Sequence, residues 1–143
     1  MAAVPVAELP TGDDWLYELK LDGYRALLIK KGGAVTVQSR NHKDLTQMVP
    51  TVATAGRGLK AQQGIVDGEI VAVDASGRPS FQALQHRSLH PHHQVLFYAF
   101  DLLALNGQDL TQKPLTERRA QLAKIIPTDA HLRFLQALLG FRE

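Results

Sequence analysis

The sequence predicts an α+β fold in which antiparallel β-sheets are flanked by helices. Three observations predict it. Stretches rich in β-branched and aromatic residues come in adjacent pairs joined by short turns, segments with helical spacing are scattered between the pairs, and no internal repeat runs through the chain. Strands that follow one another through tight turns pair antiparallel, whereas a parallel sheet would need a long crossover after each strand.

The first forty residues are predicted to form an irregular lead-in and then three strands. Residues 1–14 contain Pro5 and Pro10, which oppose regular structure. The side chains that follow alternate in character, and two glycine-containing turns interrupt them at residues 22–23 and 32–33. The expected strands cover residues 15–20, 24–31 and 34–39 and form an antiparallel meander.

The middle of the chain predicts one helical region and two buried strands. Residues 44–63 lose the alternation and indicate a short helix or two, broken by Pro50. The β-branched run at residues 65–74 predicts a strand. Residues 95–105 form the most apolar run of the chain and predict a second, buried strand.

Two further helices are predicted from capping residues and apolar spacing. Ser80 is a plausible N-cap for a helix over residues 80–85. Thr116 can cap a helix over residues 115–126, where apolar residues recur at helical spacing. No clear element is predicted from Thr128 onward.

Composition limits the class of protein. The chain has 143 residues, of which 45% are hydrophobic and 21% charged, and this suits one domain with a single core. It has no cysteine, no signal-like N-terminus and no apolar run long enough to cross a membrane, so we expect a cytoplasmic protein without membrane contact. The net charge of +2 permits contact with a polyanion without requiring it.

The strongest chemical signal is the run Lys20-Leu21-Asp22-Gly23-Tyr24-Arg25, preceded by Glu18. Side chains two apart share a face of a strand, so Glu18, Lys20 and Asp22 would project together. An uncharged lysine amine can attack phosphate, and an arginine can hold phosphate oxygens as charge develops. From spacing alone, however, an ordinary solvated strand face with weak ion pairs is the favoured interpretation.

The same run resembles the K-x-D-G-x-R motif of the covalent nucleotidyltransferases, and further blocks follow in the order of that family. Three such blocks come after the lysine motif: Ser39-Arg40-Asn41, Asp67-Gly68-Glu69-Ile70-Val71 and Phe97-Tyr98-Ala99-Phe100-Asp101-Leu102-Leu103. Four ordered blocks make a chance match improbable. Over residues 8 to 126 the chain is similar to ATP-dependent DNA ligases, and most to the ligase domain of bacterial DNA ligase D.

The resemblance implies an incomplete ATP-grasp-like nucleotidyltransferase domain and a role for each matched residue. Lys20 would be the catalytic residue that attacks ATP and carries AMP, and Arg40 would contact nucleic-acid phosphate. Glu69 would hold the ribose hydroxyl or a Mg²⁺ ion. The residues that match cofactor-binding positions are Glu18 beside the adenine edge, Asp22, Arg25 near the ribose and phosphates, Glu69, and Phe100 stacked on adenine.

The implied function is sealing of nicked or broken duplex DNA in repair and recombination. Lys20 would be adenylated by ATP, AMP would pass to a DNA 5′-phosphate, and the 3′-hydroxyl would then attack. Association with other repair domains is a further expectation. Magnesium would offset the charge of the phosphates.

Two departures from the family pattern stand out. His42 replaces a glycine that usually follows the Ser-Arg-Asn block, which histidine tolerates at modest cost if the position needs a positive φ. Residues 135–143 match none of the later family blocks. Residues 1–143 therefore read as the N-terminal portion of an adenylation domain without its OB-fold domain, and we expect this chain alone to lack full ligation activity.

Other interpretations stay open. The chain could be an RNA ligase or capping-type nucleotidyltransferase, which shares the lysine motif, or a non-catalytic truncated remnant that binds nucleotide or DNA. A metal site is one interpretation of the dense histidine cluster formed by His86, His90, His92 and His93. The neighbouring Pro91 favours an exposed connection there instead.

Overall fold

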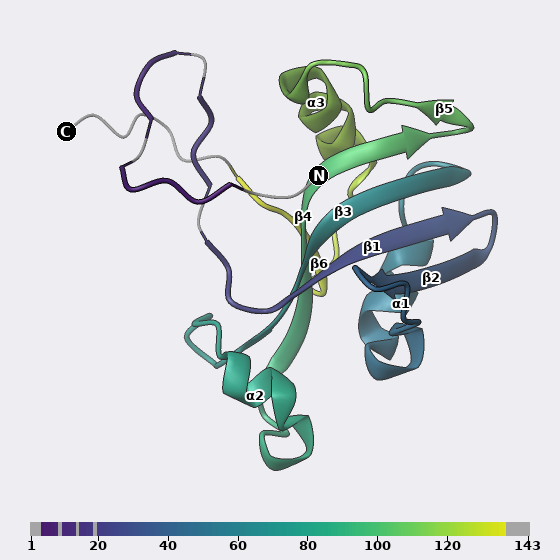
Figure 1. Cartoon of the computed structure of the whole chain (residues 1–143). Coiled ribbons are helices and arrows are strands. Elements are labelled where there is room, and N and C mark those ends of the chain that lie inside the picture. The colour runs from purple at the N-terminus through teal and green to yellow at the C-terminus, as the bar shows by residue number, and fades with distance from the viewer. Residues whose placement is uncertain (1–3, 9, 14, 19, 137–143) are drawn as a thin grey trace.

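The computed structural model describes residues 4–8, 10–13, 15–18 and 20–136. Their centre is a curled sheet of six strands in the order β2-β1-β3-β4-β5, with β6 paired to β4 off this path. All neighbours are antiparallel except β4 and β6, which are parallel. Figure 1 shows the long strands β3 and β4 curving through the middle of the molecule. The mixed α+β class predicted from the sequence is confirmed.

The elements follow one another in an irregular order of strands and short helices. They are β1 (Tyr24–Lys31), β2 (Ala34–Ser39), the 3-10 helix η1 (Thr46–Met48), α1 (Pro50–Arg57), β3 (Gln63–Val73), α2 (Phe81–Gln85), the 3-10 helix η2 (Arg87–Leu89), β4 (Gln94–Leu105), β5 (Gln108–Asp109), α3 (Leu115–Ile125) and β6 (Leu132–Phe134). The predicted strands at 24–31 and 34–39 therefore have the observed bounds, and those at 65–74 and 95–105 are β3 and β4 within two residues.

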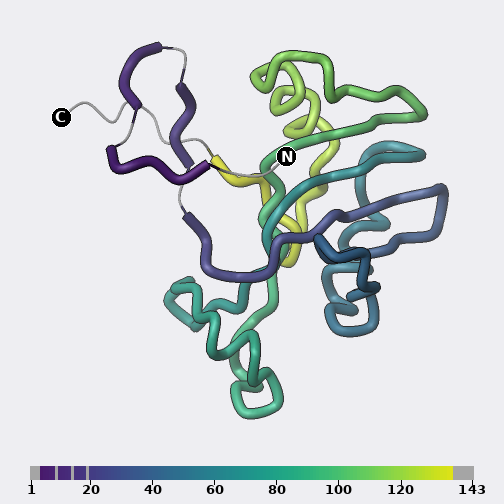
Figure 2. Tube along the Cα trace, viewed as in Figure 1, coloured from purple at the N-terminus to yellow at the C-terminus, as the bar shows by residue number. Residues whose placement is uncertain are grey.

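The strand predicted at residues 15–20 is wrong. The described residues of this segment lie outside the strands and helices of the fold and precede β1 as irregular chain. Side-chain contacts hold the segment instead of a ladder, because the Tyr17 hydroxyl donates to the Pro10 carbonyl and Glu18 pairs with Arg119. Figure 2 shows the lead-in looping away from the sheet before the chain enters β1.

The predicted short helix or two, broken by Pro50, is confirmed, since η1 ends at Met48 and Pro50 begins α1, where its missing N–H is not needed. Two smaller predictions about α3 and the C-terminal region are wrong. Thr116 is not the cap of α3, which follows Pro114 without a side-chain cap. A strand, β6, forms after Thr128. Ser80 does cap α2, since its hydroxyl accepts from the Ala83 backbone N–H at 3.1 Å.

The main core lies on one face of the sheet, beneath α1 and α3. Leu28 of β1, Val66 of β3 and Leu102 of β4 are fully buried there together with Val52 of α1 and Leu122 of α3. Because side chains alternate along a strand, the neighbours of these core residues point to the opposite face. The fold thus covers one face of the sheet with helices, and the other face carries charged side chains together with a small buried cluster of Val71, Val73 and Leu96.

A buried ion pair fixes α3 on β4. Arg118 is 9% exposed and donates to both carboxylate oxygens of Asp101, at 2.9 and 3.1 Å. Its third nitrogen, Nη1, donates to the Lys113 carbonyl at 2.6 Å. Bidentate pairing of this kind is directional as well as strong, so it sets the rotation of α3 about its axis. Within the described residues, none of the helices combines the length and the apolar character that crossing a membrane requires.

Candidate active site

Three charged side chains come together on the open face through the register of β1 and β3. Arg25 lies opposite Glu69, and Leu27 lies opposite Asp67. Residues two apart on a strand share a face, so Arg25 is directly across from Glu69 and diagonal to Asp67. The alternation that buries Ala26 and Leu28 under the helices therefore places these charges on the other side.

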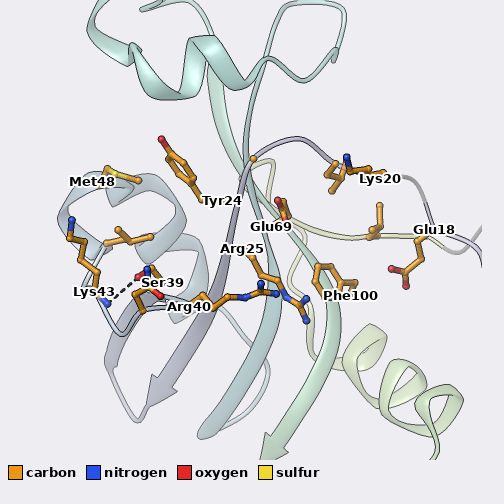
Figure 3. Close-up of a pocket in the computed structure, with 15 residues that line it drawn as sticks. Glu18, Lys20, Tyr24, Arg25, Ser39, Arg40, Lys43, Met48, Glu69 and Phe100 are labelled. Carbon is orange, nitrogen blue, oxygen red and sulfur yellow. Dashed lines mark hydrogen bonds between the residues drawn. The ribbon is translucent and has the colours of Figure 1, made fainter. Parts of the chain in front are cut away.

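An open pocket of about 950 Å³ lies over this face. Six residues singled out in the sequence line it: Glu18, Lys20, Arg25, Arg40, Glu69 and Phe100. Asp22 does not belong to the lining. Figure 3 shows Lys20, Glu18 and Phe100 at one side, Met48, Lys43 and Ser39 at the other, and Arg25 and Glu69 between them. Volumes of this size suit a small-molecule ligand.

Gly23 is required by a close approach to β3. A Cβ atom at this position would lie 1.9 Å from the Ile70 carbonyl oxygen, so any other residue would displace the chain. The tight crossing brings the Gly23 backbone N–H near the carboxylate of Glu69, where it lowers the pKa of that group. The glycine of the lysine motif thus joins the segment that carries Lys20 to the strand that carries Glu69.

Arg25 is held on two sides. Its Nε and Nη2 atoms donate to the two carboxylate oxygens of Asp67, at 3.1 and 2.7 Å. Its guanidinium carbon lies 5.3 Å from the centre of the Phe100 ring, within the range of a cation–π contact. The hydrogen bond to Asp67 raises the pKa of Arg25, so the side chain stays cationic. Asp67 therefore fixes the Arg25 head group.

The electrostatics of Glu69 are set mainly by burial. Partial removal from water raises the pKa of this carboxyl, while Arg25 and the Gly23 backbone N–H act in the opposite direction. Asp67 and Asp22 add a smaller effect that raises the Glu69 pKa further. The group is therefore an acceptor whose solvation is incomplete, which is suited to receive a hydroxyl donor or a cation.

Glu18 is tied to Arg119, a residue that the sequence interpretation missed. Arg119 donates to the Glu18 carboxylate from a position that is only 6% exposed. Burial raises the pKa of Glu18, and Arg119 lowers it. Helical spacing could have found this residue, because Arg119 lies three positions before Leu122 and six before Ile125, on the buried stripe of α3.

Comparison with known proteins decides the family. Residues 4–139 match the family described as the ATP dependent DNA ligase domain. The chain belongs to this family. It is 40% identical over 122 residues to the multifunctional non-homologous end joining protein LigD of Pseudomonas aeruginosa, covering 85% of this chain and 14% of that protein. A DNA ligase of Aeropyrum pernix is 42% identical over 119 residues, covering 76% of this chain and 20% of the relative.

Solved structures of the ligase family have the same fold. The ligase domain of M. tuberculosis LigD superposes with a TM-score of 0.76 at 34% identity, over 88% of this chain and 41% of that one. A mycobacterial DNA ligase D complexed with ATP and MES gives a TM-score of 0.74 at 34% identity, with the same coverage. The chain therefore spans less than half of the ligase structures it matches and about a fifth or less of these two curated relatives.

The ligase block around Arg40 forms a tight turn at the end of β2. His42, which replaces the usual glycine, has a φ of 63°, a conformation that histidine adopts at modest cost. Ser39 closes the turn, since its carbonyl accepts from the His42 N–H at 3.0 Å and its hydroxyl accepts from the Lys43 N–H at 3.0 Å. The turn presents Arg40 and Lys43 at the pocket wall opposite Lys20.

The histidine-rich segment contributes nothing to this pocket. His90 and His93 pack edge to face with ring centres 5.2 Å apart. Among the residues that the structure describes, no group of three or more His, Cys, Asp or Glu side chains is arranged to hold a metal ion. A Mg²⁺ ion at Glu69 would therefore need oxygen ligands from phosphate and water as well, which is its usual mode of binding.

Proposed function

We propose that this chain contributes the adenylation site of an ATP-dependent DNA ligase and that Lys20 carries AMP. The observation that carries the proposal is the convergence of Lys20, Glu69, Arg25 and Phe100 on one open pocket of about 950 Å³. A lysine beside an aromatic ring, an arginine and a carboxylate offers a nucleophile, a base platform and groups for the ribose and phosphates. Membership of the ligase family and the likeness to a DNA ligase D complexed with ATP support it.

The proposed first step is a displacement at the α-phosphorus of ATP. The Lys20 amine, in its uncharged form, forms an N–P bond as the bond to pyrophosphate breaks, and the amine loses a proton. Arg25 stands near the pocket centre as a fixed cation, and such charges stabilise transferring phosphoryl groups without reorganising. A Mg²⁺ ion bound at Glu69 would neutralise phosphate charge during this step.

The pocket also offers groups for the nucleoside. The Phe100 ring is the base platform in this proposal, and because Arg25 lies over one of its faces, adenine would take the other. Glu18 would accept from the exocyclic amine of adenine, and Glu69 from a ribose hydroxyl. Asp22, outside the lining, would act only through the local field of the site.

The subsequent steps concern DNA. AMP would pass from Lys20 to the 5′-phosphate of a nicked or broken duplex, and the adjacent 3′-hydroxyl would displace it. Arg40 at the pocket rim would contact a DNA phosphate, which positions the strand without reading its sequence. The name of the Pseudomonas relative points to end joining, and to other repair domains as partners.

The decisive test is covalent labelling of the purified chain. After incubation with ATP and Mg²⁺, intact-mass spectrometry should show an increase of one AMP, and Lys20→Ala should abolish it because the attacking amine is gone. Lys31→Ala is the matched control, since Lys31 is exposed at the far end of β1 and outside the pocket. It should label like the unsubstituted chain.

Parallel incubations separate the competing functions. Labelling by GTP in preference to ATP would support a capping-type nucleotidyltransferase, and transfer of AMP to RNA in preference to nicked DNA would support an RNA ligase. A folded chain that gains no adduct with either nucleotide would contradict the proposal and support a non-catalytic binding role.

A further inference from the structure

Arg119 connects pocket-lining residues that are far apart in the sequence. Its Nη1 donates to the Glu18 carboxylate and to the Phe100 carbonyl, the latter at 2.8 Å. Its Nη2 donates to the Leu135 carbonyl at 2.7 Å. Glu18, Phe100 and Leu135 all line the pocket, whereas Arg119 does not.

The surroundings of Arg119 fix its head group in one place. Its guanidinium carbon lies 4.8 Å from the centre of the Phe134 ring of β6. With the residue 6% exposed, its charge is shielded from water and its pairing with Glu18 is correspondingly strong. The planar guanidinium presents its donors at fixed angles, so the Glu18 carboxylate and the Phe100 carbonyl are positioned relative to each other.

We propose that Arg119 is a positioning residue for nucleotide recognition, which acts by orienting Glu18 and the Phe100 backbone at the pocket wall; the inference rests on the proposed function. Arg119 touches no reacting atom. It leaves Glu18 with unused acceptor sites, because a carboxylate has about four and Arg119 occupies one oxygen.

The proposal makes Arg119 a determinant of base selectivity. Adenine presents an amino donor at the position where guanine presents a carbonyl oxygen. A fixed carboxylate accepts a hydrogen bond from the adenine amino group and repels the guanine carbonyl oxygen. If Arg119 orients that carboxylate, its removal weakens ATP binding and also reduces the preference for ATP over GTP, which a general loss of stability would not do.

Arg118 provides a matched control from the neighbouring position. It is a buried arginine of the same helix and is also paired with a carboxylate, but its partners Asp101 and Lys113 lie outside the pocket. Arg118→Met should therefore destabilise the fold, as removal of one partner of a buried pair does, and leave base selectivity within about twofold of the unsubstituted chain.

The experiment measures ATP and GTP binding by calorimetry on the full chain, with each variant held below its own unfolding temperature. Arg119→Met should weaken ATP binding and lower the ATP/GTP affinity ratio by about tenfold or more. Arg119→Lys keeps the positive charge, so its ATP/GTP affinity ratio should lie between those of Arg119→Met and the unsubstituted chain. Should Arg119→Met fail to fold, Arg119→Lys carries the test with an intermediate loss of selectivity.

A double-substitution cycle tests the route through Glu18. If Arg119 acts through that carboxylate, Arg119→Lys should have little further effect on the ATP/GTP ratio in a chain that already carries Glu18→Gln. Independent effects of the two substitutions, or equal selectivity in Arg119 and Arg118 variants, would overturn the inference and leave the proposed function intact. Absence of ATP binding by the unsubstituted chain would overturn both.

Discussion

At position 69 the chain places a carboxyl group partly away from water on the open face of the sheet. Burial raises the pKa of Glu69, although Arg25 and the Gly23 N–H partly oppose it. A partly buried carboxyl with a raised pKa lowers the stability of the fold when it is ionised. This loss of stability is common at residues that serve binding more than folding. Asp67, by contrast, is paired directly with Arg25 and leaves that cation fixed.

The pH dependence of stability follows from this raised pKa. The folded state binds the Glu69 proton more tightly than the unfolded state, so this contribution is fully present below the ordinary pKa of 4.5 and is lost as pH rises through the higher folded value. Relative to the unsubstituted chain, Glu69→Gln should therefore gain free energy of unfolding as pH rises from about 4 to about 7. Urea unfolding at several pH values measures the difference.

Glu117→Gln is the control for that measurement. The Glu117 side chain is 49% exposed and pairs with Lys113, which lies just before α3, an exposed interaction worth at most about 1 kcal/mol. The free energy of unfolding of Glu117→Gln should differ little from that of the unsubstituted chain over the same pH range. The raised pKa of Glu69 would be contradicted if the free energy of unfolding of Glu69→Gln stayed parallel to that of the unsubstituted chain, or fell relative to it, as pH rises towards neutral.

Among the elements, those with strong local signals were predictable and those made by tertiary contacts were not. The hairpin of β1 and β2 follows from alternation and a Gly-Gly turn, and the cap of α2 from Ser80. Residues 15–18 alternate equally well, but within the described residues only Tyr17 forms an isolated β-bridge there and no strand develops, so the pattern misled. The three-residue β6 exists because β4 offers it a parallel edge, which no local pattern reports.

The candidate site divides in the same way. The residues quoted from the family blocks could be named from the sequence, and the pleat explains why Arg25 and Glu69 share a face. The contacts that hold these residues in place could not be predicted from the sequence, because they join positions that are far apart in the chain. Arg25 meets Asp67 across a separation of 42 residues, and Arg119 meets Glu18 across 101.

The turn into β1 makes a prediction at the level of element packing. Gly23→Ala should lower the free energy of unfolding by about 3 kcal/mol, because the added methyl group would overlap the Ile70 carbonyl and force β1 away from β3. Gly33→Ala is the control, since nothing lies within 4 Å of a Cβ there. Denaturant titration compares the two. Equal stability of both variants would show that the crossing relaxes freely.

For the whole molecule, the division between the two faces of the sheet is the main organising feature. Helices α1 and α3 cover the apolar face, and the opposite face carries the pocket with its charged lining. The net charge is only +2, so attraction to a polyanion depends on where the cations lie more than on their total. Arg40 and Lys43 lie at the pocket wall opposite Lys20, and under the proposed function they would face DNA phosphates.

DNA binding should therefore depend on that wall and not on the helical face. Arg40→Ala should weaken binding to two nicked duplexes of unrelated sequence by the same factor and reduce the slope of log affinity against log salt by about 1, because one phosphate contact is lost. Arg57 is exposed at the end of α1, so Arg57→Ala should change neither the DNA affinity nor its salt dependence. Fluorescence anisotropy over a salt series measures both; a sequence-dependent loss would contradict a phosphate contact.

The contact between Arg119 and Glu18 also sets an order of events as the polypeptide is made. Ribosomes deliver Lys20 and Glu18 first, and about a hundred residues must follow before α3 appears. Until then Glu18 lacks the Arg119 guanidinium that orients it. Under the proposed function, a nascent chain would thus acquire the Lys20 amine early and the complete wall of the nucleotide pocket late.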